Sequence, residues 1–163
     1  MKGCSPSVKE RCYTALVRPL VEYASTVWSP HTAANINKIE QVQRCAARFV
    51  NNDFRRQSSV TEILQQLKWD FLQERRARSQ LVMLYKIQHQ LVAIPAATYL
   101  VPSTRSTRGH DIRYLQPHTR ILVYKYSYFP TVIRLWNTLP ATVVGSLTLE
   151  QFTRDITEIR LTP

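Results

Sequence analysis

The chain of 163 residues carries 22 Lys or Arg against 11 Asp or Glu, and 44% of its residues are hydrophobic. This length predicts a single domain with a sizeable core and is short for two domains. The formal net charge of +11, with a sequence pI near 10.0, attracts polyanions, so we expect nucleic acid as the first class of partner and an anionic membrane surface as the second. No apolar run approaches the roughly 18 residues of a membrane span, and the N-terminus lacks the apolar core of a signal peptide. We therefore expect an intracellular protein, cytoplasmic or nuclear, that has no membrane partner.

The residue types that catalysis or metal binding would require form no recognised motif. Cys4, Cys12 and Cys45 include no close pair and no adjacent His, so neither a disulfide framework nor a zinc site is indicated. The 3 glycines are too few for a phosphate-binding loop, and the chain contains no paired Asp, His-x-Glu, Gly-x-Ser-x-Gly or Cys-x-x-Cys sequence. The sequence predicts no catalytic residue, no metal and no cofactor.

A helix with an internal proline is predicted around residues 16–30. Apolar residues recur every three or four positions, the spacing of one buried helix face, at Val8, Cys12, Leu16, Leu20, Tyr23, Ala24 and Val27. Two starts fit, either Ser5 as the N-cap or Ser7 in a capping box. Pro19 lacks an N–H and crowds the carbonyl of Ala15, so we expect a bend that costs roughly 3 kcal/mol unless packing offsets it.

A second helix is expected to begin near Thr32 and to form an antiparallel hairpin with the first. Its apolar positions are Ala33, Ile36, Ile39, Val42, Ala46, Phe49 and Val50. The opposite face carries a polar line with a positive C-terminal end, formed by Lys38, Gln41, Arg44 and Arg48. This line suits the helix dipole and equally suits contact with phosphate groups, so the sequence leaves both interpretations open.

The longest helix is predicted from residue 71 to 91 or 92, about 30 Å in length and capped by Asp70. A loop with Arg55 and Arg56 and a short helix with a capping box at Ser59 and Glu62 precede it. Its inward residues include Leu72, Leu81, Leu84, Tyr85 and Ile87. Three positive charges near its start oppose the helix dipole by about 0.3 to 1 kcal/mol each, which indicates either anion contact or a solvated face: Arg75, Arg76 and Arg78.

A basic, proline-punctuated connector follows Pro95. Between residues 103 and 126 the single acid is Asp111, whereas the basic residues are Arg105, Arg108, Arg113, Arg120 and Lys125, with His110 and His118 beside them. Arginine can bind a phosphate through two N–H groups at once, and tyrosine can stack on bases. The interleaved Tyr114, Tyr124 and Tyr126 therefore favour an RNA-contacting or single-strand-contacting segment over a packed loop. Residues 121–129 alternate enough to allow a short strand or hairpin. Helical spacing resumes at Val132, and Thr148 with Gln151 caps a final helix whose apolar side is Leu149, Phe152, Ile156 and Ile159.

Six blocks in register resemble the C-terminal region of reverse transcriptases from non-LTR retrotransposons of the LINE-like, jockey and chicken-repeat type. They are LVRPLVEYASTVWSP at Leu16, INKIEQVQRCAARFV at Ile36, SSVTEILQQLKW at Ser58, LVMLYKI at Leu81, TRGHD at Thr107 and YKYSYFPTVIRLWNTLP at Tyr124, and together they span about residues 2–161. The resemblance implies that residues 16–50 correspond to the polymerase thumb or the helices after it, and the rest to a post-thumb region that grips element RNA or target DNA. The family's Tyr-x-Asp-Asp motif and its endonuclease domain are absent from this sequence, so we expect no enzyme activity from the chain alone.

These observations predict a mainly α fold, an antiparallel helical bundle with an irregular basic connector and room for a short β element in the C-terminal half. We expect one domain over 1–163, made of a helical bundle (1–94), the connector (95–126) and C-terminal helices (127–163). The predicted function is non-catalytic nucleic-acid binding within a retrotransposon reverse transcriptase, with RNA, DNA and the upstream polymerase domain as partners. The alternative is a structural relic or protein-interaction fragment. The residues predicted to contact phosphate are Arg55, Arg56, Arg75, Arg76, Arg78, Arg105, Arg108, His110, Lys125 and Arg134.

Overall fold

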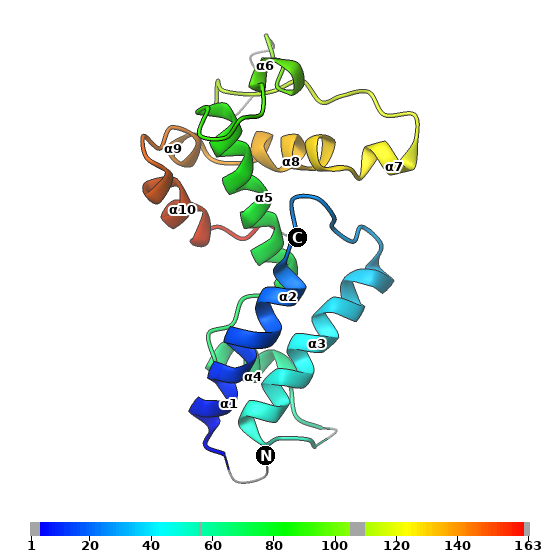
Figure 1. Ribbon diagram of the computed structural model, residues 1–163, viewed down its shortest axis with the longest axis vertical. Helices are drawn as coiled ribbons and strands as arrows, with labels where there is room; N and C mark the ends of the chain where they lie inside the picture. The colour runs from blue at the N-terminus through cyan, green and yellow to red at the C-terminus, as the bar shows by residue number, and fades with distance from the viewer. Residues whose placement is uncertain (1–3, 56, 105–109, 162–163) are drawn as a thin grey trace. The chain divides into compact units, whose positions relative to one another are not determined.

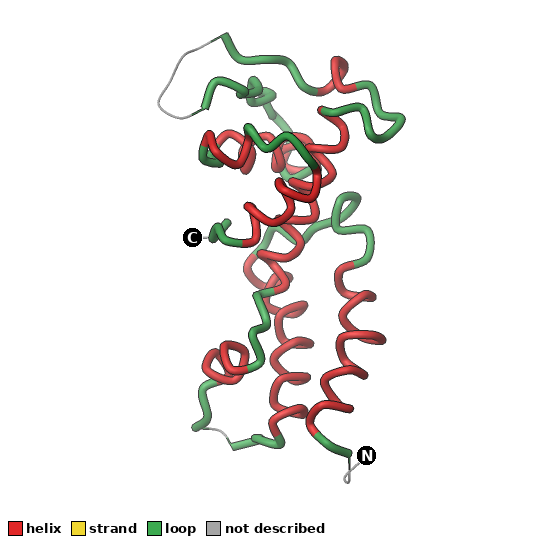
Figure 2. Tube along the Cα trace, turned by 90° about the vertical axis from the view of Figure 1, so that its left-hand side faces the viewer, coloured by secondary structure: helices red, strands yellow, loops and turns green. Residues whose placement is uncertain are grey.

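The computed structural model describes residues 4–55, 57–104 and 110–161. These residues are mainly helical, which confirms the predicted fold class at that level (Figure 1). No strand forms among them, and an isolated antiparallel bridge joins Pro102 to Tyr114 (Figure 2). The strand or hairpin predicted within 121–129 is wrong: α7 (Leu122–Lys125) and the first turn of α8 (Tyr128–Asn137) occupy this stretch. Pro130 explains part of the difference, because proline fits the first turn of a helix and interrupts a central strand.

Tertiary contacts group the chain into two compact units. Unit 1 combines Met1–Ala24 with Pro30–Arg75, and unit 2 combines Ser25–Ser29 with Arg76–Pro163. Helix α5 (Leu72–Gln88) contributes residues to both units, which no sequence pattern indicated. The limits therefore differ from the predicted segments 1–94, 95–126 and 127–163, and the organisation as a single domain stays a prediction.

Unit 1 begins with three helical pieces that follow one another directly: α1 (Pro6–Cys12), the π-helical turn η1 (Tyr13–Val17) and α2 (Arg18–Glu22). Ser5 is the N-cap, which selects the first of the two predicted starts. Pro19 cannot donate a backbone hydrogen bond, and the turn before it widens so that the Arg18 N–H reaches the carbonyl of Tyr13, five residues back. A single π turn therefore stands where Pro19 predicted a bend in the helix.

The buried face predicted for this first helical stretch is wrong. Three side chains at helical spacing are 67%, 73% and 76% exposed: Leu16, Leu20 and Tyr23. The buried side instead carries Lys9 and Tyr13. Tyr13 stacks on Trp69 with ring centroids 4.5 Å apart, and Lys9 Nζ donates to the carbonyl of Phe49 at 3.3 Å. These partners are distant in sequence, so local spacing alone could not identify the buried side.

Helix α3 (Ala33–Asn51) begins where the sequence predicts, because the Thr32 hydroxyl accepts a hydrogen bond from the Asn35 N–H at 3.4 Å. Val50 is buried as predicted, but the other buried residues of α3 lie outside the predicted apolar line, and two of them are polar: Glu40, Gln43 and Ala47. Val42, which the sequence places inside, is exposed. The polar residues are buried because each has a hydrogen-bond partner near the start of α5.

The two buried polar side chains of α3 hold the entry to α5. Glu40 Oε1 accepts the Gln73 N–H at 2.8 Å, which supplies an acceptor for a first-turn donor that has no intrahelical partner. Gln43 Nε2 donates to the carbonyl of Asp70 at 2.8 Å, and its Oε1 accepts the Tyr13 hydroxyl at 3.2 Å. The negative charge of Glu40 beside a helix N-terminus is also favoured by the helix dipole.

Two further N-caps and the burial of α5 match the sequence. Ser59 accepts from the Glu62 N–H at the start of α4 (Val60–Gln66), and Thr148 accepts from the Gln151 N–H at the start of α10 (Leu149–Thr157). The five predicted inward residues of α5 are all buried: Leu72, Leu81, Leu84, Tyr85 and Ile87. At 17 residues α5 is shorter than predicted and shorter than α3, which has 19.

The core of unit 2 surrounds the second half of α5. Buried apolar side chains from α5, α8, α9 (Ala141–Val144) and α10 meet there, with Leu100 and Tyr114 from the connector; α6 (Ala96–Tyr99) precedes Leu100. Tyr85 stacks on Phe152 at 4.6 Å and on His89 at 4.1 Å, and its hydroxyl donates to the carbonyl of Ser146. Trp136 is fully buried beside Phe152.

Three helices end in the same reversed turn without glycine. After α3, α4 and α5 the residues Asn52, Lys68 and Gln90 have φ values of 53°, 54° and 55°. In each turn the next N–H bonds to a carbonyl five residues back, as the Schellman motif requires: Asp53 to Arg48, Trp69 to Leu64 and Leu91 to Lys86. A lysine or glutamine in the left-handed region costs roughly 1 kcal/mol that glycine avoids.

Lys68→Gly and Gln90→Gly are each expected to raise the free energy of unfolding by about 0.5 to 1 kcal/mol. Equilibrium urea unfolding measures the change. Asn52→Gly should gain no stability, because asparagine already tolerates this conformation and because glycine would remove the side-chain acceptor of the buried Lys9. A loss of stability in both variants would contradict the assigned turn geometry.

Alkaline pH should destabilise the fold through its buried tyrosines. Burial raises the pKa of Tyr13 and of Tyr114 to about 12, and burial also raises the pKa of Tyr128. Each folded pKa lies above the unfolded value near 10, so the stabilisation is present below about pH 10 and is lost as the pH rises toward 12. Urea unfolding across this range, with tyrosinate absorbance as the second readout, should show the loss. A constant free energy of unfolding up to pH 12 would contradict it.

Candidate nucleic-acid interface

Residues 112–149 form a stretch of 38 residues that contains no Asp or Glu, and we call it the acid-free segment. Its four cations are Arg113, Arg120, Lys125 and Arg134, and the last three are exposed. Within the described ranges, the ion pairs found involve Arg55 and Arg75 and leave these three exposed cations available. Arg120, Lys125 and Arg134 therefore give unit 2 exposed positive charge outside the ion pairs found among the described residues.

Helix α8 positions the first part of the acid-free segment. Trp136 Nε1 donates to the carbonyl of Ile112 at 2.9 Å, and the amide of Asn137 bonds both the N–H and the carbonyl of Tyr114, at 3.1 and 2.8 Å. Gln116 Nε2 donates to the carbonyl of Pro130 at 2.8 Å. These bonds hold the connector on α8 as far as Gln116, and most side chains between that point and α7 lie in solvent.

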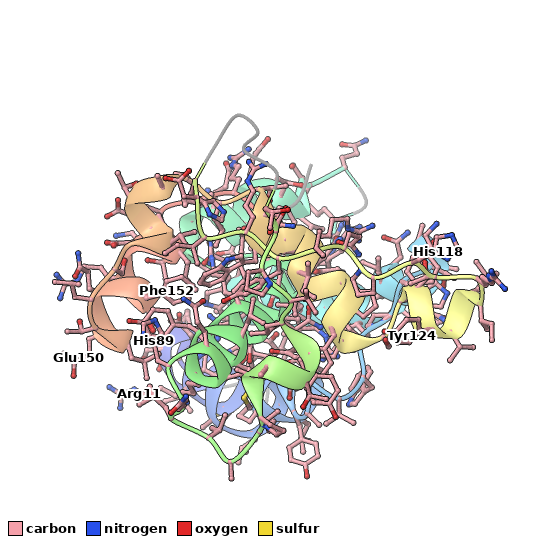
Figure 3. The ribbon with its side chains drawn as sticks, turned by 90° about the horizontal axis from the view of Figure 1, so that it is seen from above. Arg11, His89, His118, Tyr124, Glu150 and Phe152 are labelled. Carbon is pink, nitrogen blue, oxygen red and sulfur yellow. The ribbon has the colours of Figure 1, made fainter. Side chains whose placement is uncertain are left out.

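Helix α7 presents apolar and aromatic side chains between two cations. Ile121, Leu122 and Val123 are 68%, 68% and 82% exposed, and Arg120 and Lys125 flank them. Tyr124 is exposed on the same short helix, and Figure 3 shows it together with His118 of the preceding segment. This combination of cations and exposed rings suits phosphate contact and base stacking together.

The three arginines near the start of α5 have partners within their own units. Arg75 forms a two-pronged ion pair with Glu22, with Nη2 at 3.1 Å from Oε2, and the hydrogen bond to that carboxylate raises the pKa of Arg75. Arg76 is buried against Trp28, and Arg78 donates to the carbonyl of Thr157 at 3.1 Å. These contacts explain why cations occupy a position that the helix dipole disfavours, so external anions are not needed to account for them.

Two other predicted site residues also have internal partners. Arg55 is exposed and pairs with Asp53, with Nε at 3.1 Å from Oδ1, and this pair holds the pKa of the Asp53 carboxyl well below its usual range. His110 is buried, with Nε2 at 3.1 Å from the carbonyl of Trp136. A histidine in that position contributes to holding the connector on α8 and presents little surface to a phosphate group.

Of the ten predicted site residues, Lys125 and Arg134 are the two that the structure brings to the exposed surface of the acid-free segment. Arg56, Arg105 and Arg108 lie outside the described residues. Arg120 is a candidate that the predicted set of phosphate contacts omitted. The sequence does contain a signal for it, because the stretch without acids ends only at Glu150. The stretch 75–110 also lacks acids, but its Arg75 and Arg76 have internal partners, so the structure is needed to separate exposed cations from paired ones.

The described residues define a mainly helical protein in which the acid-free segment carries three exposed cations. They contain no group of three or more His, Cys, Asp or Glu side chains that could hold a metal ion, and no described helix is long and apolar enough to cross a membrane. Comparison with protein-family models finds no match for this chain, and neither do searches of curated proteins and of solved structures.

Proposed function

We propose that this chain is a non-catalytic nucleic-acid-binding fragment whose contact surface is the acid-free segment of unit 2. The observation that supports the proposal best is the exposure of Arg120, Lys125 and Arg134 within 38 residues that lack acids. Nucleic acids carry closely spaced phosphate charges, and each cation that contacts a phosphate releases condensed counterions, which favours binding. The net charge of +11 adds long-range attraction for the same class of partner.

The origin of the fragment is part of the same proposal. The six sequence blocks that resemble non-LTR retrotransposon reverse transcriptases support a thumb and post-thumb region, arranged as an antiparallel helical bundle and joined in the parent protein to a polymerase domain. In such a protein a cationic surface would grip element RNA, or template and primer, while the chemistry takes place elsewhere. The proposed location is intracellular, where such nucleic acids occur.

A protein-interaction fragment is the second candidate. The observation that favours it is the exposure of three large apolar residues within eight positions of unit 1, Leu16, Leu20 and Tyr23, each more than half exposed. Exposed apolar surface, where it gathers into a patch, commonly marks a contact with another protein. This candidate requires no affinity for nucleic acid, so a binding measurement separates it from the first.

The test compares two triple variants that remove the same charge. Arg120→Gln, Lys125→Gln and Arg134→Gln together should weaken binding to single-stranded RNA by about tenfold at about 0.1 M salt and reduce the slope of log affinity against log salt by about 2. Arg11→Gln, Lys38→Gln and Arg44→Gln remove three exposed cations of unit 1, including two from the polar line of α3. This second variant should retain most of the affinity and the salt slope.

Fluorescence anisotropy with labelled RNA, DNA and hybrid duplex, read across a salt series, gives both quantities. Equal losses in the two triple variants would indicate binding by net charge alone and would contradict a localised interface. A larger loss of affinity in the unit 1 variant would indicate that the interface lies on unit 1 and would contradict the proposal. Absence of any salt-sensitive binding by the unmodified chain would refute the nucleic-acid function and leave the protein-interaction candidate.

A further inference from the structure

Trp28 is an exposed tryptophan whose ring packs against the guanidinium of Arg76. It belongs to the Ser25–Ser29 segment of unit 2, and 45% of the residue is exposed. Trp136, in contrast, is fully buried, and Trp69 is packed against Tyr13. Tryptophan contributes the largest apolar surface of any side chain, so one that is nearly half exposed and yet ordered by neighbours calls for a functional explanation.

Two side chains of α5 hold the Ser25–Ser29 segment. Arg76 is 3% exposed, with Cζ 4.0 Å from the centroid of the Trp28 ring, and its Nη2 donates to the Trp28 carbonyl. Gln80, one turn further along the same face of α5, donates through Nε2 to the carbonyl of Ser25 at 2.9 Å. The segment is therefore fixed near both ends, and the guanidinium lies against the ring of Trp28.

These contacts preorganise the Trp28 side chain for binding. The guanidinium attracts one face of the indole through cation–π interaction, and the hydrogen bond to the Trp28 carbonyl fixes the backbone that carries the ring. The conformational entropy of ordering the side chain is then lost on folding and not on binding, which favours the ligand. The exposed 45% of the residue is surface that a second flat group could contact.

We propose that Trp28 is a stacking platform for an unpaired nucleobase, so that the nucleic acid bound by this chain is single-stranded. This inference rests on the proposed nucleic-acid function and adds the class of substrate to it. Nucleobases are planar and heteroaromatic, and every base offers a π face, so stacking on tryptophan needs no particular sequence. In a duplex the base faces are already stacked on their neighbours, whereas a single strand leaves them free.

The test uses two probes of about 20 nucleotides, an intact single-stranded oligodeoxynucleotide and an abasic one with the same phosphates. The unmodified chain should bind the intact strand about 5- to 150-fold more tightly than the abasic strand. Trp28→Leu should lose most of that difference while its affinity for the abasic strand stays unchanged, and Trp28→Phe should retain part of it. Tyr23→Leu is the matched control, since Tyr23 is 76% exposed in the same part of the sequence and should have no effect.

The outcomes separate this inference from the function on which it rests. Failure of the unmodified chain to bind either strand would refute the nucleic-acid function itself. Equal binding of the intact and abasic strands, tighter binding of a duplex of the same sequence, or full retention of the difference in Trp28→Leu would overturn the stacking platform alone. An equal loss for both strands in Trp28→Leu, with a lowered melting temperature, would show that the ring only supports the fold and would also overturn it.

Discussion

The start of α5 depends on buried polar side chains of α3. Glu40 accepts the Gln73 N–H, and Gln43 bridges the Asp70 carbonyl and the Tyr13 hydroxyl, so three separate parts of unit 1 meet at one network. A buried carboxylate or amide with no partner at all would cost several kcal/mol, so the hydrogen bonds of Glu40 Oε1 and of both polar atoms of the Gln43 side chain favour this arrangement. Helix α5 also supplies core side chains to unit 2.

Much of the positive charge of this chain serves the fold. Lys9 reaches the C-terminal end of α3, where it bonds the Phe49 carbonyl and Asn52, and Arg48 donates to the carbonyls of Arg55 and Ser58. Cations near helix C-termini and loop carbonyls satisfy acceptors that would otherwise lack donors. A net charge of +11 therefore overstates the charge that is available to a partner. The exposed cations that have no acid near them in the sequence are concentrated between residues 120 and 134 of unit 2.

The sequence predicted the elements whose causes are local. The caps at Thr32, Ser59 and Thr148 act within one turn, and the apolar spacing of α10 correctly places Phe152 and Ile156 in the core. Prediction failed where the deciding partner is far away in the chain. The apolar line through Leu16 and Leu20 has helical spacing, but Tyr13 is drawn inward by Trp69 and Gln43, which lie in other helices or loops.

For the candidate site, too, the sequence indicated some features, and others required the structure. Charge composition led to nucleic acid as the expected partner, which stays a prediction. The arginines of α5 could not be separated from free cations without knowing that Glu22, Trp28 and Thr157 contact them. Trp28 is not among the residues that the sequence predicted to contact nucleic acid. The structure shows that Trp28 is partly exposed and that Arg76 and Gln80 hold its segment, and neither fact could be read from the sequence.

Unit 2 is proposed to bind nucleic acid through the acid-free segment. Amide hydrogen exchange of the whole chain, with and without a saturating single-stranded oligonucleotide of about 20 nucleotides, tests this claim most directly because every described region is read at once. We expect slower exchange in residues 116–134 and in Ser25–Ser29, with α3 unchanged. Protection confined to α3, or binding that slows exchange nowhere in unit 2, would contradict the proposal.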